Sequence, residues 1–250
     1  MDYFLTIAAS DNSGGAGVQQ DIKVAHDLGY WALSAITGIT AQNFNNVIDL
    51  EAVNPRLLQS QIEQCCSSFN VQTIKIGAIC SPENIKVIAD CLKKYHCENV
   101  VLDPVLTSTS GKAFLDKPSL HILKETLFPL TKLITPNKHE FEILTNRKIN
   151  TIDEGIEIAK DYCKEWNTSI LIKGGHFSDI KIKEALITKD NVFNYEKERI
   201  TFSYLHGTGC TLSTALSCFL GKNISFEDAY TLASEYLVKL YHSLQIKLAI

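Results

Sequence analysis

The chain has 250 residues, 45% of them hydrophobic and 21% charged, which suffices for one large domain or two small ones with a buried core. The formal net charge of −4 at pH 7 argues against a general nucleic-acid-binding protein, so any phosphate site must be built locally. Met1-Asp2-Tyr3 lacks the basic segment of a secretory signal and no apolar run approaches the roughly 18 residues of a membrane span, so we expect a cytoplasmic protein without membrane partners.

Apolar runs and cap signals predict that strands and helices alternate through most of the chain. A strand over 3–9 enters the glycine-rich loop 10–17, which opens a helix over 18–28. Asn54-Pro55 and Ser81-Pro82 are typical helix starts, and Thr151 with Glu154 predicts a capping box. Further strands are expected over 31–37, 47–53, 73–79, 100–102, 132–135 and 169–173, and further helices over 55–69, 82–95, 118–127, 140–144 and 152–166.

The last third of the chain departs from this alternation. Short strands over 184–188, 192–195 and 199–202 follow one another without helices, which indicates an antiparallel edge. A helix that ends near Gly221 and another over 226–244 close the chain. The order predicts one α/β domain over 1–250, a doubly wound and mostly parallel sheet with an antiparallel edge. The loops after its parallel strands should meet at the carboxyl ends of those strands, where such sheets bind ligands.

The eight cysteines include no Cys-x-x-Cys pair, which argues against a zinc ribbon and against thioredoxin-type chemistry. We expect most of them to be reduced core residues.

The stretch Gly207-Thr208-Gly209-Cys210 directly precedes the helix that ends near Gly221. A helix N-terminus attracts anions, and the two glycines leave room for a ligand to approach. Cys210 lies in the first helical turn, where the helix dipole would loosen the proton of its thiol. From these residues alone, an anion site with a titratable thiol and an ordinary cap with a buried cysteine remain equally open.

Seven motifs near strand ends occur in one order along the chain. They are SDNSGGAGVQQD (10–21), ITAQN (39–43), KIGAI (75–79), VLDPV (101–105), TPNKHE (135–140), IKGGH (172–176) and HGTGCT (206–211). As a set, over about residues 4–242, they resemble the hydroxymethylpyrimidine/phosphomethylpyrimidine kinases of thiamine biosynthesis, within the ribokinase-like superfamily.

This resemblance implies a three-layer α/β/α fold and an ATP- and Mg²⁺-dependent transferase. Its members phosphorylate 4-amino-5-hydroxymethyl-2-methylpyrimidine to the monophosphate and then to the diphosphate. Relatives are commonly homodimers, so a homodimer is expected.

The resemblance also implies roles for the phosphate-handling residues. Backbone N–H groups of Gly207, Thr208 and Gly209 would form the anion hole for the γ-phosphoryl group, with Thr208 also facing the nucleotide. Cys210 matches the position of the general base, where sugar-kinase relatives carry Asp, and a base that titrates near neutrality suits this task.

Asn137 and Glu140 match the family's Asn-x-x-Glu, in which the Glu helps to hold Mg²⁺ through water and the Asn would bind the nucleotide. Lys173 ends a strand, where its ammonium could reach the nucleotide phosphates. Asp103, at the end of a buried strand, needs a partner, so we expect it to bind metal-bound water or to serve the phosphate site rather than merely to form a turn. Lys173 could also be a surface lysine at a strand end. Glu140 could be a first-turn helix acid favoured by the dipole, or fill both roles.

Substrate recognition falls to the first half of the chain. Gln42 would pair its amide with the aminopyrimidine edge, with Gly17 and Ala78 beside the ring. Asp21 would face the pocket as a substrate-binding or loop-fixing carboxylate. Asp11 should hold the first loop by bonds from its own side chain, while His176 and His206 are interpreted as loop residues without metal-ligand spacing.

Two departures from the family pattern bear on specificity. Ala78 stands where the family usually has Met, and Thr109 where many relatives have Lys. A pyridoxal kinase of the same branch is therefore the alternative function. A binding protein without catalysis is a second alternative, against which Cys210, Lys173 and Glu140 argue together.

Overall fold

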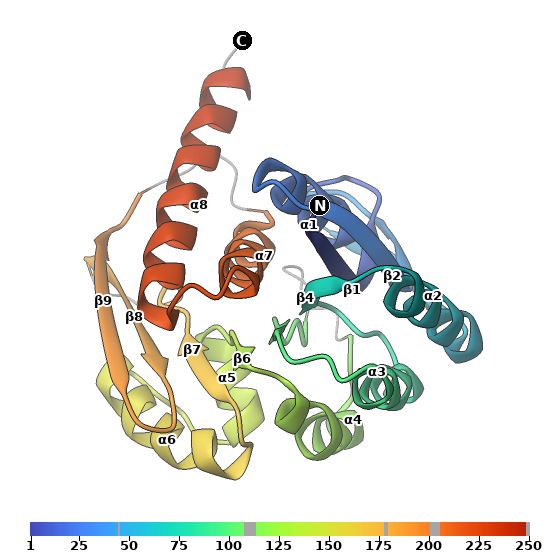
Figure 1. Cartoon of the computed structure of the whole chain (residues 1–250). Helices are drawn as coiled ribbons and strands as arrows, with labels where there is room; N and C mark the ends of the chain where they lie inside the picture. The colour runs from blue at the N-terminus through green and yellow to red at the C-terminus, as the bar shows by residue number, and fades with distance from the viewer. Residues whose placement is uncertain (45, 108–113, 178–179, 201–205, 249–250) are drawn as a thin grey trace.

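The computed structural model describes the whole chain except residues 45, 108–113, 178–179, 201–205 and 249–250 (Figure 1). Its described strands form one nine-stranded sheet in the order β3-β2-β1-β4-β5-β6-β7-β8-β9. In chain order the strands are β1 (Tyr3–Asp11), β2 (Trp31–Gln42), β3 (Val47–Ala52), β4 (Val71–Ile76), β5 (Val100–Leu102), β6 (Leu133–Ile134), β7 (Ser169–Ile172), β8 (Lys181–Ile187) and β9 (Val192–Glu198).

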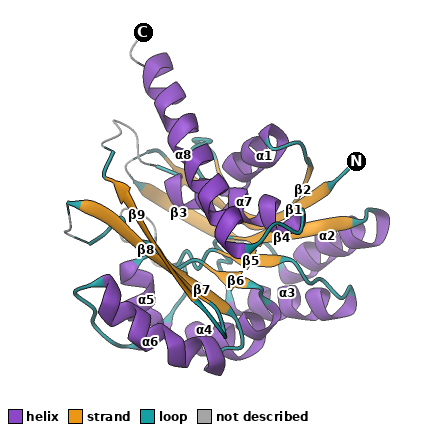
Figure 2. Ribbon diagram, turned by 60° about the vertical axis from the view of Figure 1, so that its left-hand side comes forward, coloured by secondary structure: helices purple, strands orange, loops and turns teal. Residues whose placement is uncertain are grey.

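Helices cover both faces of the sheet and make three layers (Figure 2). On one face lie α1 (Gly17–Asp27), α7 (Thr208–Gly221) and α8 (Phe226–Leu248). On the other lie α2 (Pro55–Ser68), α3 (Pro82–Lys94), α4 (Lys117–Ile122), α5 (Lys138–Thr145) and α6 (Ile152–Glu165). The predicted α/β class is confirmed. Within the described ranges, no helix is both long and apolar enough to cross a bilayer.

The six strands from β2 to β7 in the sheet order pair in parallel, and antiparallel strands lie at both edges. The edge formed by β8 and β9 was predicted, but the antiparallel pairing of β3 with β2 was not. Because the hairpin after β2 extends that strand, Gln42 ends a strand instead of lying in a loop. The expected strand over 199–202 is absent at Arg199 and Ile200, and its remainder falls outside the described residues.

Cap signals located the helix starts correctly. The Asn54 side chain accepts a hydrogen bond from the Arg56 N–H, and Ser81 accepts one from the Asn84 N–H. The helix expected over 118–127 is divided instead, into α4, one π-helical turn to Leu127 and a 3₁₀ turn over Phe128–Leu130. Pro129, in that last turn, has no N–H for a continuing α-helix.

A buried ion pair joins one helix layer to the centre of the sheet. The Lys75 ammonium on β4 lies 2.9 Å from both carboxylate oxygens of Asp21 on α1, and both side chains are fully buried. Thr6 on β1 and Thr214 on α7 donate hydrogen bonds of 2.6 and 2.8 Å to the same carboxylate. Burial alone would lower the pKa of Lys75, but the Asp21 charge outweighs it and the pKa is raised.

This pair corrects the role expected for Asp21. Its carboxylate does not face a pocket, because three donors and the packing of α1, β1, β4 and α7 enclose it. Of the two expected roles, these contacts favour the fixing one, in which the Asp21 carboxylate holds α1 against β1, β4 and α7. Lys75 lies within the motif at 75–79 but was assigned no role from sequence.

Replacing Lys75 by Met should destabilise the fold strongly. The Asp21 carboxylate would remain buried without its cation, which costs about 3–5 kcal/mol in free energy of unfolding. Urea unfolding of wild type and variant at pH 7 measures this difference. Lys160→Met is the matched control, since Lys160 pairs with Glu157 at the surface and should contribute less than about 1 kcal/mol. Equal, small effects of the two substitutions would show that the buried pair is dispensable.

Candidate active site

Residues from four separate segments meet at the carboxyl ends of the central strands. Asp103 follows β5, Asn137 follows β6 and Lys173 follows β7, and Asn137 and Lys173 pair as an isolated parallel bridge. A Cβ atom placed on Gly209, in the first turn of α7, would lie 3.4 Å from the Lys173 ammonium and 3.6 Å from an Asp103 oxygen. The predicted convergence of these loops is therefore present in the structure.

Asp103 and Lys173 form the charged centre of this site. The Lys173 Nζ atom lies 2.7 Å from Asp103 Oδ1, and their side chains are 12% and 2% exposed. Ser213 and Thr135 hydroxyls donate to the same carboxylate over 3.2 and 3.3 Å. Burial would raise the pKa of Asp103, but Lys173 and Lys75 bring it below its ordinary value.

Lys173 is not the surface lysine that the sequence left open. Burial lowers its pKa, and the carboxylates of Asp103 and Glu140 more than reverse that effect, so the ammonium stays charged. An ammonium has three N–H donors. Asp103 accepts a hydrogen bond from one of these donors in the ion pair. No local pattern in the sequence indicates this contact, because the two residues are 70 positions apart.

Glu140 begins α5 in a capping box with Asn137. Its N–H donates to Asn137 Oδ1 over 3.0 Å, and its carboxylate accepts from the Asn137 N–H over 2.8 Å. Burial raises the pKa of Glu140 to about 7, opposed by Lys173 and assisted by the Asp103 carboxylate. The helix-acid interpretation is thus correct, and the same carboxyl group lies in the field of Asp103 and Lys173.

The donor set suits a hydrated magnesium ion. Mg²⁺ keeps several waters and is held by one or two carboxylates together with substrate phosphates. Asp103 is close enough to Glu140 for its charge to raise the pKa of the Glu140 carboxyl. Among the described residues, no three His, Cys, Asp or Glu side chains converge to cage a metal, so the protein offers two carboxylates only.

Cys210 lies in the first turn of α7, partly exposed. Enclosure by protein raises the pKa of its thiol, and the Asp21 and Asp103 carboxylates add to this. The Lys75 charge and the Gly17 N–H, which hydrogen-bonds the sulfur, act in the opposite direction without prevailing. The expectation of a loosened thiol proton is therefore wrong, because enclosure and the two carboxylates raise the pKa.

Two glycines permit close backbone contacts, one between the first loop and the start of α7 and one within the first loop. Gly207 has φ +82°, and a Cβ there would lie 1.8 Å from the carbonyl oxygen of Gly15. Gly17 has φ +59°, and its Cβ would lie 2.4 Å from the Ala9 carbonyl oxygen. No other residue fits either position. Thr208 begins the helix, so its N–H belongs to the first turn, where backbone donors face outward.

Asp11 fastens these two loops together. Its carboxylate accepts from the N–H groups of Ser13 and Ala16, both at 2.8 Å, which confirms the expected loop-fixing role. His206 Nε2 lies 2.9 Å from the same carboxylate. Burial would raise the pKa of Asp11, but bonds from His206, Ser13 and Gln42 hold it well below its ordinary range. His206, interpreted from sequence as a loop residue only, is thus part of the fastening.

The expected substrate residues lie near this fastening. Gln42 is half-buried, its side chain bonds Asp11, and its N–H donates to Asn12 Oδ1 over 2.7 Å. Ala78 is buried in a small apolar cluster with Ala9 and Phe114. Thr109 lies outside the described residues.

Sequence comparison finds relatives over most of the chain. Residues 11–248 match the model of the phosphomethylpyrimidine kinase family. A hydroxymethylpyrimidine/phosphomethylpyrimidine kinase of Rhizobium meliloti is 36% identical, with 93% of this chain and 88% of that protein covered. A putative hydroxymethylpyrimidine/phosphomethylpyrimidine kinase 2 of Schizosaccharomyces pombe is 33% identical over 93% of this chain, which spans only 46% of that longer protein.

Solved structures agree with this result. The phosphomethylpyrimidine kinase of Clostridium difficile 630 superposes with a TM-score of 0.85 at 34% identity, over 96% of this chain and 99% of that one. The Bacillus subtilis pyridoxal kinase, solved as an ADP complex, also reaches 0.85, at 30% identity over 94% and 89% of the two chains.

The Asp11 fastening predicts a pH-dependent stability difference. Asp11→Asn keeps the size of the side chain but weakens its bonds to His206, Ser13 and Ala16. Because the folded-state pKa is depressed, ionised Asp11 stabilises the fold above its unfolded pKa of about 3.9, and this contribution is lost as pH falls through the lower folded pKa. Wild type should therefore exceed the variant in unfolding free energy at pH 7, and the gap should narrow below about pH 4.

Urea unfolding at pH 7, 5 and 3.5 measures the difference in free energy of unfolding between wild type and Asp11→Asn. Asp90→Asn, on the exposed side of α3, is the control and should show no such trend. A gap that is absent at pH 7 would show that Asp11 does not hold the loops.

Proposed function

Because the chain belongs to the phosphomethylpyrimidine kinase family, we propose that it transfers the γ-phosphoryl group of ATP to the hydroxymethyl oxygen of 4-amino-5-hydroxymethyl-2-methylpyrimidine and then phosphorylates the monophosphate. The observation that supports this function most directly is the meeting of the α7 N-terminus with Lys173, Asp103 and Glu140 at the carboxyl ends of the sheet. An anion cradle, a fixed cation and two carboxylates are the parts that phosphoryl transfer needs.

The transferring group would lie against the start of α7. Backbone N–H groups of Gly207, Thr208 and Gly209 and of Cys210 point away from the helix and would bind its oxygens. Lys173 keeps donors beyond the one that it gives to Asp103, so it can reach a nucleotide phosphate without losing that partner. The ADP complex of the Bacillus subtilis relative supports nucleotide binding by a chain of this fold.

Mg²⁺ would be held through water by Asp103 and Glu140, with Asn137 fixing the Glu140 carboxylate. When bound, the ion supplies positive charge that neutralises the phosphate oxygens.

The hydroxyl oxygen of the substrate attacks the γ-phosphorus of ATP. The bond between the γ-phosphorus and the oxygen that bridges it to the β-phosphate breaks, and ADP leaves. Cys210 would accept the hydroxyl proton. Its raised pKa keeps the thiol protonated at neutral pH, while Lys75 and the Gly17 N–H stabilise the thiolate that does form. Such a base is scarce at pH 7 and strong once formed.

The pyrimidine would lie between the first glycine loop and the end of β2, contacting Gln42, Gly17 and Ala78. Binding there requires the Gln42 amide to exchange its bond to Asp11 for the pyrimidine edge. We further propose that the enzyme works in the cytoplasm as a homodimer and that residues 1–250 form one domain.

Cys210→Ala should lower kcat by roughly 10²–10⁴-fold, because the proposed acceptor of the hydroxyl proton would be lost. Wild-type kcat should also rise with pH up to and beyond about 8.5, the ordinary thiol pKa, since burial places the Cys210 pKa above that value. Steady-state turnover from pH 6.5 to 9.5 tests both statements.

Cys218→Ala is the matched control, because Cys218 is fully buried two turns further along the same helix. It should leave kcat and its pH profile unchanged. Wild-type turnover in Cys210→Ala would remove this residue from the mechanism.

The substrate class is tested by assaying the aminopyrimidine alcohol, its monophosphate and pyridoxal on wild type and Gln42→Leu. A two-point contact leaves buried polar groups unpaired when it is lost, at about 1–3 kcal/mol each, so kcat/KM for the aminopyrimidine should fall roughly 10–100-fold. Pyridoxal should be a poor substrate and should be affected much less by the substitution.

Pyridoxal serves as the internal control, because loss of the Gln42 bond to Asp11 would affect both substrates alike. Equal losses would mean that Gln42 shapes the loop without reading the pyrimidine. A wild type that prefers pyridoxal would establish the alternative function, and ATP bound without consumption on any substrate would identify a binding protein.

A further inference from the structure

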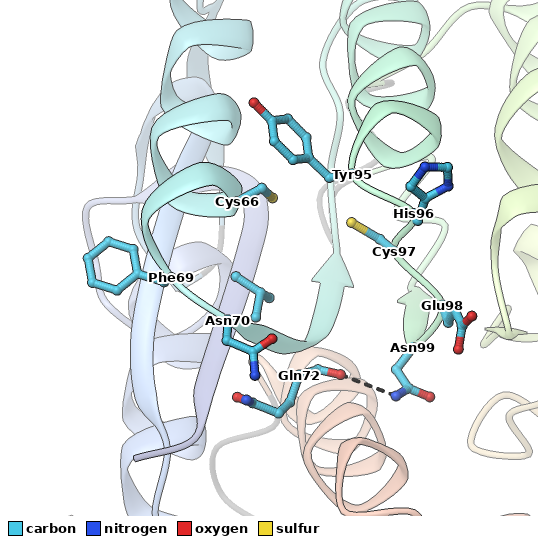
Figure 3. A pocket seen from close by; sticks show the side chains of 10 residues that line it. Cys66, Phe69, Asn70, Gln72, Tyr95, His96, Cys97, Glu98 and Asn99 are labelled. Carbon is cyan, nitrogen blue, oxygen red and sulfur yellow. Dashed lines mark hydrogen bonds between the residues drawn. The ribbon is translucent and has the colours of Figure 1, made fainter.

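A small cavity of about 280 Å³ opens at the edge of the sheet opposite the candidate active site (Figure 3). It lies where β4 and β5 begin, between the end of α2 and the turn after α3, whereas Asp103 and Lys173 lie at the far ends of their strands. Cys66 and Cys97 line it together with Tyr95, Gln72 and Asn99. None of these residues takes part in the proposed phosphoryl transfer.

The sulfur atoms of Cys66 and Cys97 point toward one another across this cavity (Figure 3). Cys66 lies in the last turns of α2, and Cys97 lies between α3 and β5. Both side chains are partly exposed, and each thiol lies close enough to the other to shift its pKa. The Cys97 N–H donates to the Leu92 carbonyl over 3.1 Å, which fixes its backbone at the end of α3.

The proximity of the two thiols makes them unequal. It raises the pKa of Cys66 and lowers the pKa of Cys97. The neighbouring cysteines behave differently, because burial raises the pKa of both Cys65 and Cys91. A lowered pKa, partial exposure and an adjacent second thiol are the properties of a cysteine that reacts with peroxide and is then resolved.

Other uses of this cluster fit less well. Among the described residues, no group of three or more metal-ligating side chains is present, so a structural zinc site is not supported here. The cavity of about 280 Å³ is also at the lower end of the about 300–1,000 Å³ that pockets for drug-sized ligands measure.

We propose that Cys66 and Cys97 are a redox-active dithiol that a hydroperoxide converts into an intramolecular disulfide. The Cys97 thiolate attacks the peroxide oxygen; the S–O bond forms, the O–O bond breaks, and the leaving alkoxide or hydroxide takes up a proton. The Cys66 sulfur then attacks the Cys97 sulfenic acid; the S–S bond forms, the S–O bond breaks, and water leaves with the Cys66 proton. The dithiol loses two electrons and the peroxide gains them.

The test treats the folded, reduced full-length protein with a small excess of hydrogen peroxide, blocks remaining thiols with iodoacetamide and digests with trypsin without reductant. A peptide linking 57–75 to 95–112 should appear, with tandem mass spectra placing the bond between Cys66 and Cys97. The alkylation count of unfolded protein should fall from eight thiols to six, and dithiothreitol should restore eight.

Cys65→Ser is the matched control, because Cys65 precedes Cys66 on the same tryptic peptide and should not be needed for the link. Cys66→Ser should abolish the link and let Cys97 proceed to the sulfinic acid, which no reductant in the assay reverses. Wild type that keeps eight thiols, or that links through Cys65 or between chains, would overturn the proposal. The result is independent of the kinase assay, so either proposal can fail without the other.

Discussion

The buried ion pair of Asp21 and Lys75 is the constraint on which the placement of the site depends. Charges in a protein interior are tolerated only in a geometry that pairs them and satisfies their hydrogen bonds. The Asp21 carboxylate meets this condition with partners on β1, β4 and α7 while its own backbone lies on α1. Because the glycine loop precedes α1 and the Gly207–Gly209 turn precedes α7, one interaction sets the relative position of both loops.

Opposed electrostatic effects decide the state of the groups around that pair. Burial disfavours charge on every one of them, and pairing restores it where a partner of opposite sign is in contact. Asp103 and Lys173 each stabilise the charged form of the other. Burial and the Asp103 carboxylate instead raise the pKa of Glu140 and so favour its neutral form. Cys210 faces carboxylates as well as Lys75, so its thiol remains protonated at neutral pH. The site thus holds the Lys173 ammonium beside the carboxyl groups of Asp103 and Glu140, whose negative charge a metal ion would balance.

Contacts between distant segments build the two sides of the molecule that carry chemistry. Gly207 touches Gly15 and His206 binds Asp11, so the turn before α7 rests on the first loop at the carboxyl edge. At the amino edge, α2 and the turn after α3 bring Cys66 and Cys97 together. The strands separate these sites, so the proposed phosphoryl transfer and the proposed thiol oxidation would share no residues.

The sequence by itself determined the alternation of strands and helices, the helix starts at Asn54 and Ser81, and the edge of the sheet at which Asp103, Lys173 and Gly209 meet. These features follow from local rules, since caps, glycine turns and apolar periods satisfy backbone and burial needs within a few residues. Only the tertiary structure decided that Asp21 pairs with Lys75, 54 positions away, and that His206 binds Asp11, 195 positions away. It likewise decided that β3 runs antiparallel, that the Cys210 pKa rises, and that two cysteines outside any Cys-x-x-Cys pair face each other. Pairing and enclosure depend on which elements pack together, and a local pattern carries no information about partners that distant in the chain.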